Sequence, residues 1–381
     1  MSFLSTGLSD AFLSALDLQG YIEPTQIQQA TIPAVISGKD VMGIAQTGSG
    51  KTASFVLPIL HNLLKLSSAK HREPTTLILT PTRELADQVL GVIRDFSRDL
   101  PQRISSVAIY GGSSVNTQMQ SLGKGNVDIV VATPGRLLDL VDKNALKLSS
   151  VSTLVLDEAD KMLNLGFKEE VDKILSLLPK KRQNLLFSAT LSPDLTAVQQ
   201  VLLVDPVIIK IESEEEERII NELGYFVTSE RKGPLLRYLI KEGKHKQVLV
   251  FASSAKTVDS VVHKLNKNGI KAAQIHSKMS QGARRETLSA FKEARLHVLV
   301  TTDLLARGID IEYLPYVINY ELPRSPKDYI HRIGRTGRAG SPGDAISLIT
   351  MAELHHFRVI QKKAGKKVPM QHSDEMNLHG F

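Results

Sequence analysis

The stretch Ala45-Gln-Thr-Gly-Ser-Gly-Lys-Thr52 decides how the first half of this chain folds. It follows the apolar run Val41–Ile44 and precedes a helix-like segment, which is typical of a glycine-rich turn between a strand and a helix. Backbone N–H groups of such a turn can face a polyphosphate, while Lys51 reaches the terminal phosphates and the Thr52 hydroxyl contacts Mg²⁺. We therefore predict a phosphate-binding loop made of Ala45, Gln46, Thr47, Gly48, Ser49, Gly50, Lys51 and Thr52.

A second decisive run, Asp157-Glu-Ala-Asp160, follows the apolar residues Leu154-Val-Leu156. The carboxyl end of a strand is where an open α/β sheet presents its chemistry. Mg²⁺ prefers oxygen ligands and keeps several waters, so Asp157 is expected to hold this metal indirectly. Glu158 is expected to orient and deprotonate the attacking water. The loop and the carboxylates together predict an enzyme that hydrolyses a nucleoside triphosphate.

Composition limits the class of protein. With 381 residues the chain is long enough for two domains, and its net charge of +7 favours a polyanionic partner. It contains no Cys, which excludes disulfides and thiolate metal sites and fits a reducing compartment, so we predict a cytoplasmic location. No apolar run approaches the ~20 residues of a membrane span and no signal peptide is visible, so we predict no membrane partner.

Short apolar runs alternate with helix-like segments, which favours an α/β fold with mostly parallel sheets flanked by helices. In the first half the expected strands are Val41–Ile44, Thr76–Leu79, Ile104–Tyr110, Ile129–Ala132, Thr153–Leu156 and Asn184–Phe187. The expected helices between them include Ser54–Leu66, Arg83–Phe96 and Lys168–Leu178. The alternation restarts later with Gly224–Val227, Gln247–Phe251, Ala272–His276, His297–Thr301, Val317–Tyr320 and Ala345–Ile349.

The alternation breaks around Asp205-Pro206 and the acidic stretch 212–217. A solvated helix start explains these acidic residues more simply than a special role does. From this break we predict four parts: an N-terminal domain over 1–211, a linker over 212–220, a C-terminal domain over 221–358 and a basic tail over 359–381.

The run Asp157–Asp160 is the signature of the DEAD-box RNA helicases, a group of superfamily 2, and the chain resembles this family from Phe3 to Ile349. Ala45, which replaces the first glycine of a strict phosphate loop, is also usual in that family. The resemblance implies two tandem RecA-like domains, ATP with Mg²⁺ as cofactors and an RNA-stimulated ATPase. It further implies local RNA unwinding or remodelling of RNA–protein complexes, with protein partners left open.

Gly20-Tyr-Ile-Glu-Pro-Thr-Gln-Ile-Gln28 resembles the Q motif of the family. The resemblance implies that Gln28 recognises adenine and that Tyr21 stacks on the base. A side-chain amide carries both a donor and an acceptor, so it can pair with the edge of adenine and reject guanine. Phe3, an isolated aromatic upstream, is expected to support this element.

The segment Tyr329–Arg338 concentrates three arginines among glycines, and arginine is a bidentate phosphate donor. By resemblance, Arg335 and Arg338 contact the γ-phosphate in the closed state, and Asp310 holds the ribose. Ser188-Ala-Thr190 resembles the family's coupling motif, so its hydroxyls are expected to hydrogen-bond Asp160. These assignments are implied by the family alone.

Several small or Arg-containing segments fall at expected strand ends and offer groups that grip phosphate rather than base edges. By resemblance they form an RNA-binding track of Pro81, Thr82, Arg83, Gly112, Thr133, Pro134, Arg136, Gln281, Arg284, Thr302 and Asp303. The chain has no Trp and only 5% aromatic residues, which argues against base stacking as its main grip. We therefore predict sequence-independent binding of single-stranded or duplex RNA through its backbone and 2′-hydroxyls.

Three other functions share many of these features. The first is an ATP-gated RNA clamp that binds without productive unwinding. The second is a DNA-directed motor of superfamily 2, which Gln28 and the Asp157–Asp160 run argue against. The third is an NTPase that does not act on nucleic acid, such as a transport ATPase.

Overall fold

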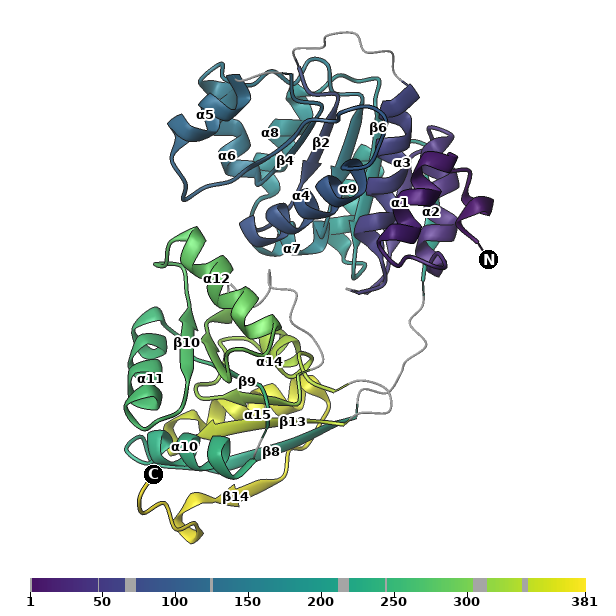
Figure 1. Ribbon diagram of the computed structural model, residues 1–381. Helices are drawn as coiled ribbons and strands as arrows, with labels where there is room; N and C mark the ends of the chain where they lie inside the picture. Colours follow the sequence, from purple (N-terminus) through teal and green to yellow (C-terminus); the bar gives the residue numbers. More distant parts are fainter. Residues whose placement is uncertain are drawn as a thin grey trace. The chain divides into compact units, whose positions relative to one another are not determined.

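The computed structural model describes residues 2–46, 48–65, 73–123, 126–211, 219–243, 245–303, 314–337 and 342–381. It divides the chain into two compact units, Met1–Ser213 and Glu214–Phe381, called here the N-terminal and the C-terminal unit. In each unit helices cover both faces of a central sheet (Figure 1). The α/β class with two parallel-sheet domains is therefore confirmed.

The N-terminal sheet has the strand order β3-β4-β2-β5-β6-β1-β7, and all its pairings are parallel. Its strands are β1 (Val41–Ile44), β2 (Thr76–Leu79), β3 (Ser106–Ile109), β4 (Ile129–Ala132), β5 (Thr153–Leu156), β6 (Gln183–Ser188) and β7 (Val207–Lys210). Every residue of β1, β2 and β4 is buried. A parallel sheet covered on both faces buries both sides of each strand, which explains why these strands are continuous apolar runs.

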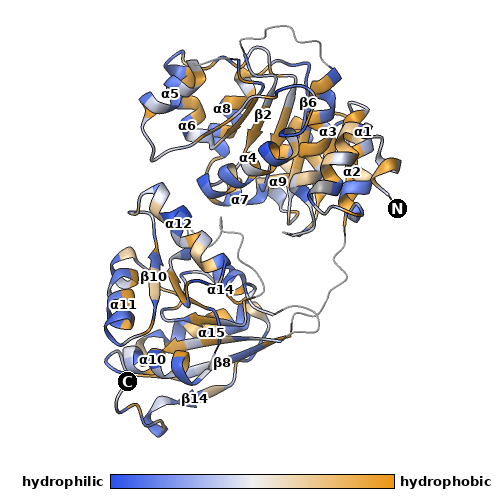
Figure 2. Ribbon diagram, in the orientation of Figure 1, coloured by the Kyte–Doolittle hydropathy of each residue, from blue (hydrophilic) through white to orange (hydrophobic). Residues whose placement is uncertain are grey.

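Two apolar layers hold this sheet between helices, and Figure 2 shows the hydrophobic residues concentrated on the strands. One layer packs η1 (Phe3–Thr6), α1 (Asp10–Leu18), α2 (Gln26–Ile36), α3 (Lys51–Lys65) and α4 (Arg83–Ser97) on one face. The other layer packs α5 (Val115–Gly123), α6 (Pro134–Asp142), α7 (Ala159–Asn164), α8 (Lys168–Leu177) and α9 (Pro193–Leu202) on the opposite face.

The C-terminal sheet has the order β10-β11-β9-β12-β13-β8-β14 and is also parallel. Its strands are β8 (Ile220–Phe226), β9 (Val248–Phe251), β10 (Ala272–Ile275), β11 (Val298–Thr301), β12 (Tyr316–Asn319), β13 (Gly343–Ile349) and β14 (Met370–His372). One apolar layer holds α10 (Lys232–Gly243) and α11 (Ala255–Lys267). The other layers hold α12 (Gln281–Lys292), α14 (Pro326–Ile333) and α15 (Leu354–Ala364).

The structure differs from the sequence-based expectation mainly at the sheet edges. β7 directly follows the Asp205-Pro206 break and buries only Ile209 fully, and β14 is only three residues long with no apolar run, so the sequence predicts neither. The stretch 359–381, expected as a basic tail, continues α15 to Ala364 and then adds β14 to the edge of β8. Burial of Ile360 and Val368 holds this stretch on the C-terminal unit.

The predicted domain limits meet the structure only in part. Most of the predicted linker, residues 212–218, lies outside the described residues. β8 begins at Ile220, the last residue of that linker. In the described ranges no helix combines the length and apolar character that crossing a membrane requires.

Candidate active site and RNA-facing surface

The topology of the N-terminal sheet gathers the predicted nucleotide residues at one edge. The loops that follow β5, β6 and β1 carry the acidic run, Ser188–Thr190 and the phosphate loop, and these three strands are neighbours in the sheet. Because the strands are parallel, their carboxyl ends meet at the same edge. Residues far apart in the sequence therefore converge on one site.

The phosphate loop needs glycine at two positions. Gly48 and Gly50 have φ values of 84° and 91°, which residues with a side chain rarely adopt. A Cβ atom on Gly50 would also lie 2.5 Å from Nε2 of Gln28. The Thr25 hydroxyl donates to the Ser49 carbonyl at 2.8 Å, and Nε2 of Gln28 donates to the Gly50 carbonyl at 3.2 Å. The Q-motif segment thus holds the loop directly.

Gln28 lies beside this loop, and both predicted adenine residues, Gln28 and Tyr21, are also used within the protein. Oε1 of Gln28 accepts a hydrogen bond from the Thr25 backbone N–H at 2.9 Å, which caps α2. An amide can make more than two hydrogen bonds, so each end of Gln28 retains capacity for a ligand. Tyr21 is 36% exposed and packs edge-on against Phe96 with ring centroids 5.2 Å apart. Phe3 is buried in the same core layer as α2, as a supporting residue would be.

Buried charges surround the start of α3. Lys51 is only 7% exposed, and its Nζ donates to the Ala45 carbonyl. Burial lowers the pKa of Lys51, against the attraction of the neighbouring carboxylates. Asp157 is 2% exposed, and burial together with the nearby Glu158 charge raises its pKa to about 7, while Lys51 opposes this rise. The positive charges of Lys51 and Lys161 therefore only partly offset the burial of Asp157 and the charge of Glu158.

Glu158 has a strained backbone, with φ 50° and ψ 47°, at the residue that precedes α7. Such a conformation costs roughly 1–3 kcal/mol for a residue with a side chain and is common at functional sites. The backbone N–H of Glu158 donates to Oδ1 of Asp157 at 2.9 Å. Its carboxylate forms an ion pair with Lys161 at 2.5 Å, a contact that the sequence analysis did not consider. The i, i+3 spacing on a helix was the available signal.

The structure contains the hydrogen bond expected between the coupling motif and the acidic run. Thr190 donates through Oγ1 to Oδ2 of Asp160 at 2.8 Å. Ser188 does not contact Asp160 but stabilises Thr190, since its hydroxyl donates to the Thr190 carbonyl at 2.8 Å and accepts from the Thr190 N–H at 3.2 Å. Asp160 is 6% exposed, so movement of the loop after β6 would leave a buried carboxylate without this donor.

The other half of the same edge carries the predicted RNA residues of the N-terminal unit, since β2, β4 and β3 are neighbours. The guanidinium of Arg83 covers Gly112, where φ is 83° and an added Cβ would collide with Nη1. Nη1 of Arg136 donates to the Ser113 carbonyl at 3.1 Å. Three loops therefore form one connected surface. The remaining predicted residues open helices at this edge: Pro81 and Thr82 before α4, and Thr133 and Pro134 at α6.

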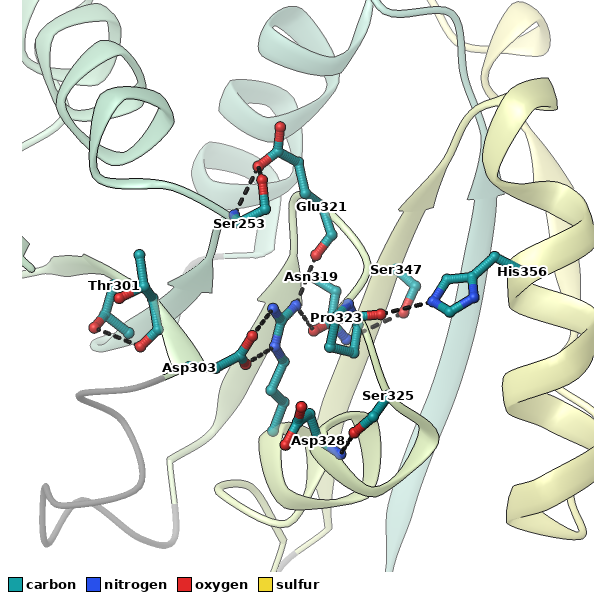
Figure 3. Close-up of polar contacts among 12 residues, drawn as sticks. Ser253, Thr301, Asp303, Asn319, Glu321, Pro323, Ser325, Asp328, Ser347 and His356 are labelled. Carbon is teal, nitrogen blue, oxygen red and sulfur yellow. Dashed lines mark hydrogen bonds and ion pairs between the residues drawn. The ribbon is translucent and has the colours of Figure 1, made fainter. Parts of the chain in front are cut away.

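In the C-terminal unit, Arg332 organises the predicted RNA residue Asp303. Figure 3 shows Asp303, Asn319 and Glu321 converging on one network of polar contacts. Its Nε and Nη2 donate to the two carboxylate oxygens of Asp303 at 2.5 and 2.8 Å. Its Nη1 donates to Oδ1 of Asn319 at 3.0 Å and to the Glu321 carbonyl at 2.6 Å. Arg332 is 2% exposed and its guanidinium lies 4.9 Å from the ring centroid of Phe251. In the sequence this arginine is one of three in the glycine-rich segment, and no motif signals its pairing with Asp303.

Other predicted residues of this unit lie at the ends of β10 and β11. Gln281 begins α12, and its Oε1 accepts from Nη2 of the buried Arg284 at 3.0 Å. Thr302 follows β11, and its carbonyl accepts from the Thr301 hydroxyl at 3.3 Å. Arg335 follows α14, and its carbonyl accepts from the Leu314 N–H at 2.9 Å. Thr47, Asp310 and Arg338 lie outside the described residues.

The chain matches two protein-family models and several known helicases. Residues 25–198 match the family model described as DEAD/DEAH box helicase, and residues 231–340 match the helicase conserved C-terminal domain. The chain is 39% identical to the ATP-dependent RNA helicase CshA of Listeria monocytogenes over 371 residues, covering 97% of this chain and 70% of that protein.

Solved structures with the same architecture include a DEAD box protein from the hyperthermophile Methanococcus jannaschii. It is 36% identical, with a TM-score of 0.52 and coverage of 97% of this chain and 99% of that one. Dbp5 of S. cerevisiae bound to RNA and ADP BeF3 is 29% identical, with a TM-score of 0.80 and coverage of 98% and 96%.

Proposed function

This chain belongs to the DEAD-box family of ATP-dependent RNA helicases, and we propose that ATP binding and hydrolysis at its N-terminal edge drive local duplex unwinding or remodelling of RNA–protein complexes. The observation that carries the proposal is the convergence of the phosphate loop, the acidic run and the Thr190–Asp160 hydrogen bond on adjacent strands. This convergence supports a site that combines a phosphate cradle, a water-activating carboxylate and a coupling contact.

In the proposed catalytic step, Lys51 binds the terminal phosphates and Glu158 takes the proton of the attacking water. Asp157 and the Thr52 hydroxyl would hold Mg²⁺, which neutralises phosphate charge when bound. The residues fit this ion, because Asp157 is a buried carboxylate whose pKa is raised by burial and by Glu158. A divalent cation would add to the positive charge of Lys51 and Lys161 and favour the ionised form of Asp157.

The remaining nucleotide contacts are proposed from the family's motifs. Gln28 and Tyr21 would recognise adenine, and the position of Gln28 against the Gly50 carbonyl supports this by placing its amide at the phosphate loop. Arg335 and Arg338 would stabilise the γ-phosphate, and Asp310 would hold the ribose. Dbp5, which this chain resembles over 98% of its length, is bound to ADP BeF3 together with RNA, which supports simultaneous binding of both ligands.

RNA would bind along the carboxyl edges through its phosphates and 2′-hydroxyls. The connected loops that carry Arg83, Gly112 and Arg136 support this proposal. They offer guanidinium groups and backbone that a phosphate can approach closely, rather than aromatic rings on which bases could stack. Asp303 would contribute from the position that Arg332 gives it. Because binding of ATP and RNA would favour one state, each ligand would strengthen the other's binding.

The test is ATP turnover by the full chain with RNA, with DNA of the same sequence and without nucleic acid, together with displacement of a short RNA duplex. The proposal predicts strong stimulation by RNA, weak stimulation by DNA, and displacement that requires ATP. Equal stimulation by DNA would indicate a DNA-directed motor, and stimulation without displacement would indicate an RNA clamp. Turnover that RNA does not change would overturn the proposal.

We also propose that the protein acts in the cytoplasm, away from membranes, because its substrate is RNA. Cell fractionation tests this location, and recovery of the full-length protein in the membrane fraction would contradict it. The RNA–protein complexes on which it acts would be identified by crosslinking RNA to the protein in cells.

A further inference from the structure

Helix α15 and the turn that follows it carry the densest uncompensated positive charge in the sequence. Five cations fall within ten residues: Arg358, Lys362, Lys363, Lys366 and Lys367. No Asp or Glu occurs from 354 to 372, although the whole chain has 40 acidic residues against 47 Lys and Arg. This window, called here the α15 basic face, therefore accounts for most of the net charge of +7.

The α15 basic face is exposed and largely unpaired. All five cationic side chains are exposed. Within the part of the chain that the structure describes, only Lys366 forms an ion pair with an acidic residue, Glu222, at 3.4 Å. Helix-dipole stabilisation explains lysines in the last turn of a helix, such as Lys362 and Lys363. It does not explain Arg358 in the preceding turn or Lys367 beyond the helix end.

Buried contacts of α15 and of the following turn fix the positions of these cations. Phe357 and Ile360, on the opposite face of α15, are fully buried. The helix ends at Gly365 with φ 67°, after which Oε1 of Gln361 accepts from the Val368 N–H at 2.8 Å. Because Val368 is also buried, the turn with Lys366 and Lys367 is anchored on both sides. Preorganised cations lose less entropy on binding a polyanion than those of a loose tail.

We propose that the α15 basic face is a second RNA-binding site, which grips the phosphate backbone of RNA that extends beyond the strand bound at the carboxyl edges. The inference rests on the proposed function, which brings RNA to this unit. An anionic membrane is the less suitable partner, because interfacial helices insert an apolar face and that of α15 is already buried. Phosphate contacts of this kind carry no sequence information.

The site is distinct from the predicted RNA track. Lys366 lies beside Glu222 on β8, whereas Gln281 and Arg284 follow β10. β8 and β10 are separated by five strand spacings in the sheet, or about 24 Å at ~4.8 Å per spacing. At roughly 3.4 Å per phosphate along one strand, the spacing of a B-form duplex, this span corresponds to about seven nucleotides. A strand shorter than about seven nucleotides would thus reach one site only, and a strand attached to a longer duplex would reach both.

The experiment compares two double variants of the full chain. Lys362→Gln/Lys363→Gln removes two charges from the last turn of α15, and Lys264→Gln/Lys267→Gln removes two from the last turn of α11. Binding is measured by fluorescence anisotropy against salt concentration, for a ~6-nucleotide RNA, which is shorter than the span between the sites, and for the same strand attached to a ~20-base-pair duplex. ATP turnover with the short RNA is measured in parallel.

For the α15 variant we expect the salt slope for the long RNA to fall by about 2 and its affinity to weaken by up to ~60-fold at 0.1 M salt. Binding and turnover with the short RNA should stay at wild-type values, and the α11 variant should match wild type throughout. Unchanged long-RNA binding, or equal losses for both RNAs, would overturn the second site. A wild-type protein that RNA does not stimulate would instead refute the proposed function.

A membrane arm uses phosphatidylserine vesicles with the same variants. The proposal predicts no vesicle binding that depends on Lys362 and Lys363. Loss of vesicle binding in the α15 variant with intact long-RNA binding would identify the face as a membrane contact and contradict the proposal.

Discussion

Replacing Arg332 by Met removes the only guanidinium donors of a buried network while keeping much of the side-chain volume. Four hydrogen bonds of 2.5–3.0 Å are lost, two of them to Asp303. Removing one partner of a buried ion pair costs about 3–5 kcal/mol, because the other charge stays behind. Asp303 is 28% exposed, so water reaches its carboxylate and the lower value of ~3 kcal/mol applies. This is a large part of the 5–15 kcal/mol that typically holds a domain folded.

Native-state hydrogen exchange of the full chain, read by mass spectrometry, measures this loss locally. Peptides from β11, β12 and α14 should exchange roughly 100-fold faster in Arg332→Met, because every ~1.4 kcal/mol changes an equilibrium tenfold. Peptides from the N-terminal unit serve as the internal reference. Arg324→Met, at an exposed position before α14, should leave all rates near those of wild type.

A second variant identifies the cause. Arg332→Met/Asp303→Asn removes the stranded carboxylate as well, so it should recover a substantial part of the protection. Exchange within twofold of wild type in Arg332→Met, or a double variant no better protected than the single one, would refute the role given to this ion pair.

Three other predictions concern the N-terminal edge. Gly50→Ala should weaken ATP binding at least tenfold, because its φ of 91° disfavours a side chain. Gly91→Ala, with nothing near its Cβ, should not weaken it. Equal affinities of the two variants in calorimetry would contradict this. Thr190→Val should retain ATP binding but slow duplex displacement by roughly 10–100-fold, as expected from losing a hydrogen bond of ~1.5–3 kcal/mol to Asp160. An unchanged displacement rate would show that Thr190 has no coupling role. Without Mg²⁺, the raised pKa of Asp157 means that the folded state holds its proton more tightly than the unfolded state. Stability should therefore fall as pH rises from about 4 to about 7, and a melting-temperature profile of Asp157→Asn that falls equally would contradict this.

The inner strands of both sheets could be predicted from the sequence, because burial on two faces requires continuous apolar runs such as Thr76–Leu79 and Ile129–Ala132. The edge strands β3 and β10 could be predicted as well, whereas the edge strands β7 and β14 could not. β7 alternates exposed and buried residues directly after a proline, and Met370–His372 contains no apolar run. β7 and β14 become strands by pairing with a neighbouring strand, and the local sequence does not specify that neighbour.

The same distinction applies to the site. Lys51, Asp157 and Glu158 are recognisable because phosphate and metal chemistry demands particular residue types at fixed positions along a strand–turn–helix unit. The Arg332–Asp303 pair joins residues 29 positions apart on different elements, so no spacing rule reveals it. The ion pair of Lys161 with Glu158 has the i, i+3 spacing that a sequence can signal, whereas nothing in the sequence signals the left-handed backbone of Glu158.

The central claim is that Glu158 activates the water that attacks ATP bound by the adjacent phosphate loop. Single-turnover phosphate release with saturating RNA, measured for wild type and Glu158→Gln alongside ATP affinity, tests it most directly. The account predicts wild-type affinity and a rate reduced at least 100-fold, the range expected for loss of a general base. Phosphate release at the wild-type rate, with ATP bound equally well, would contradict it.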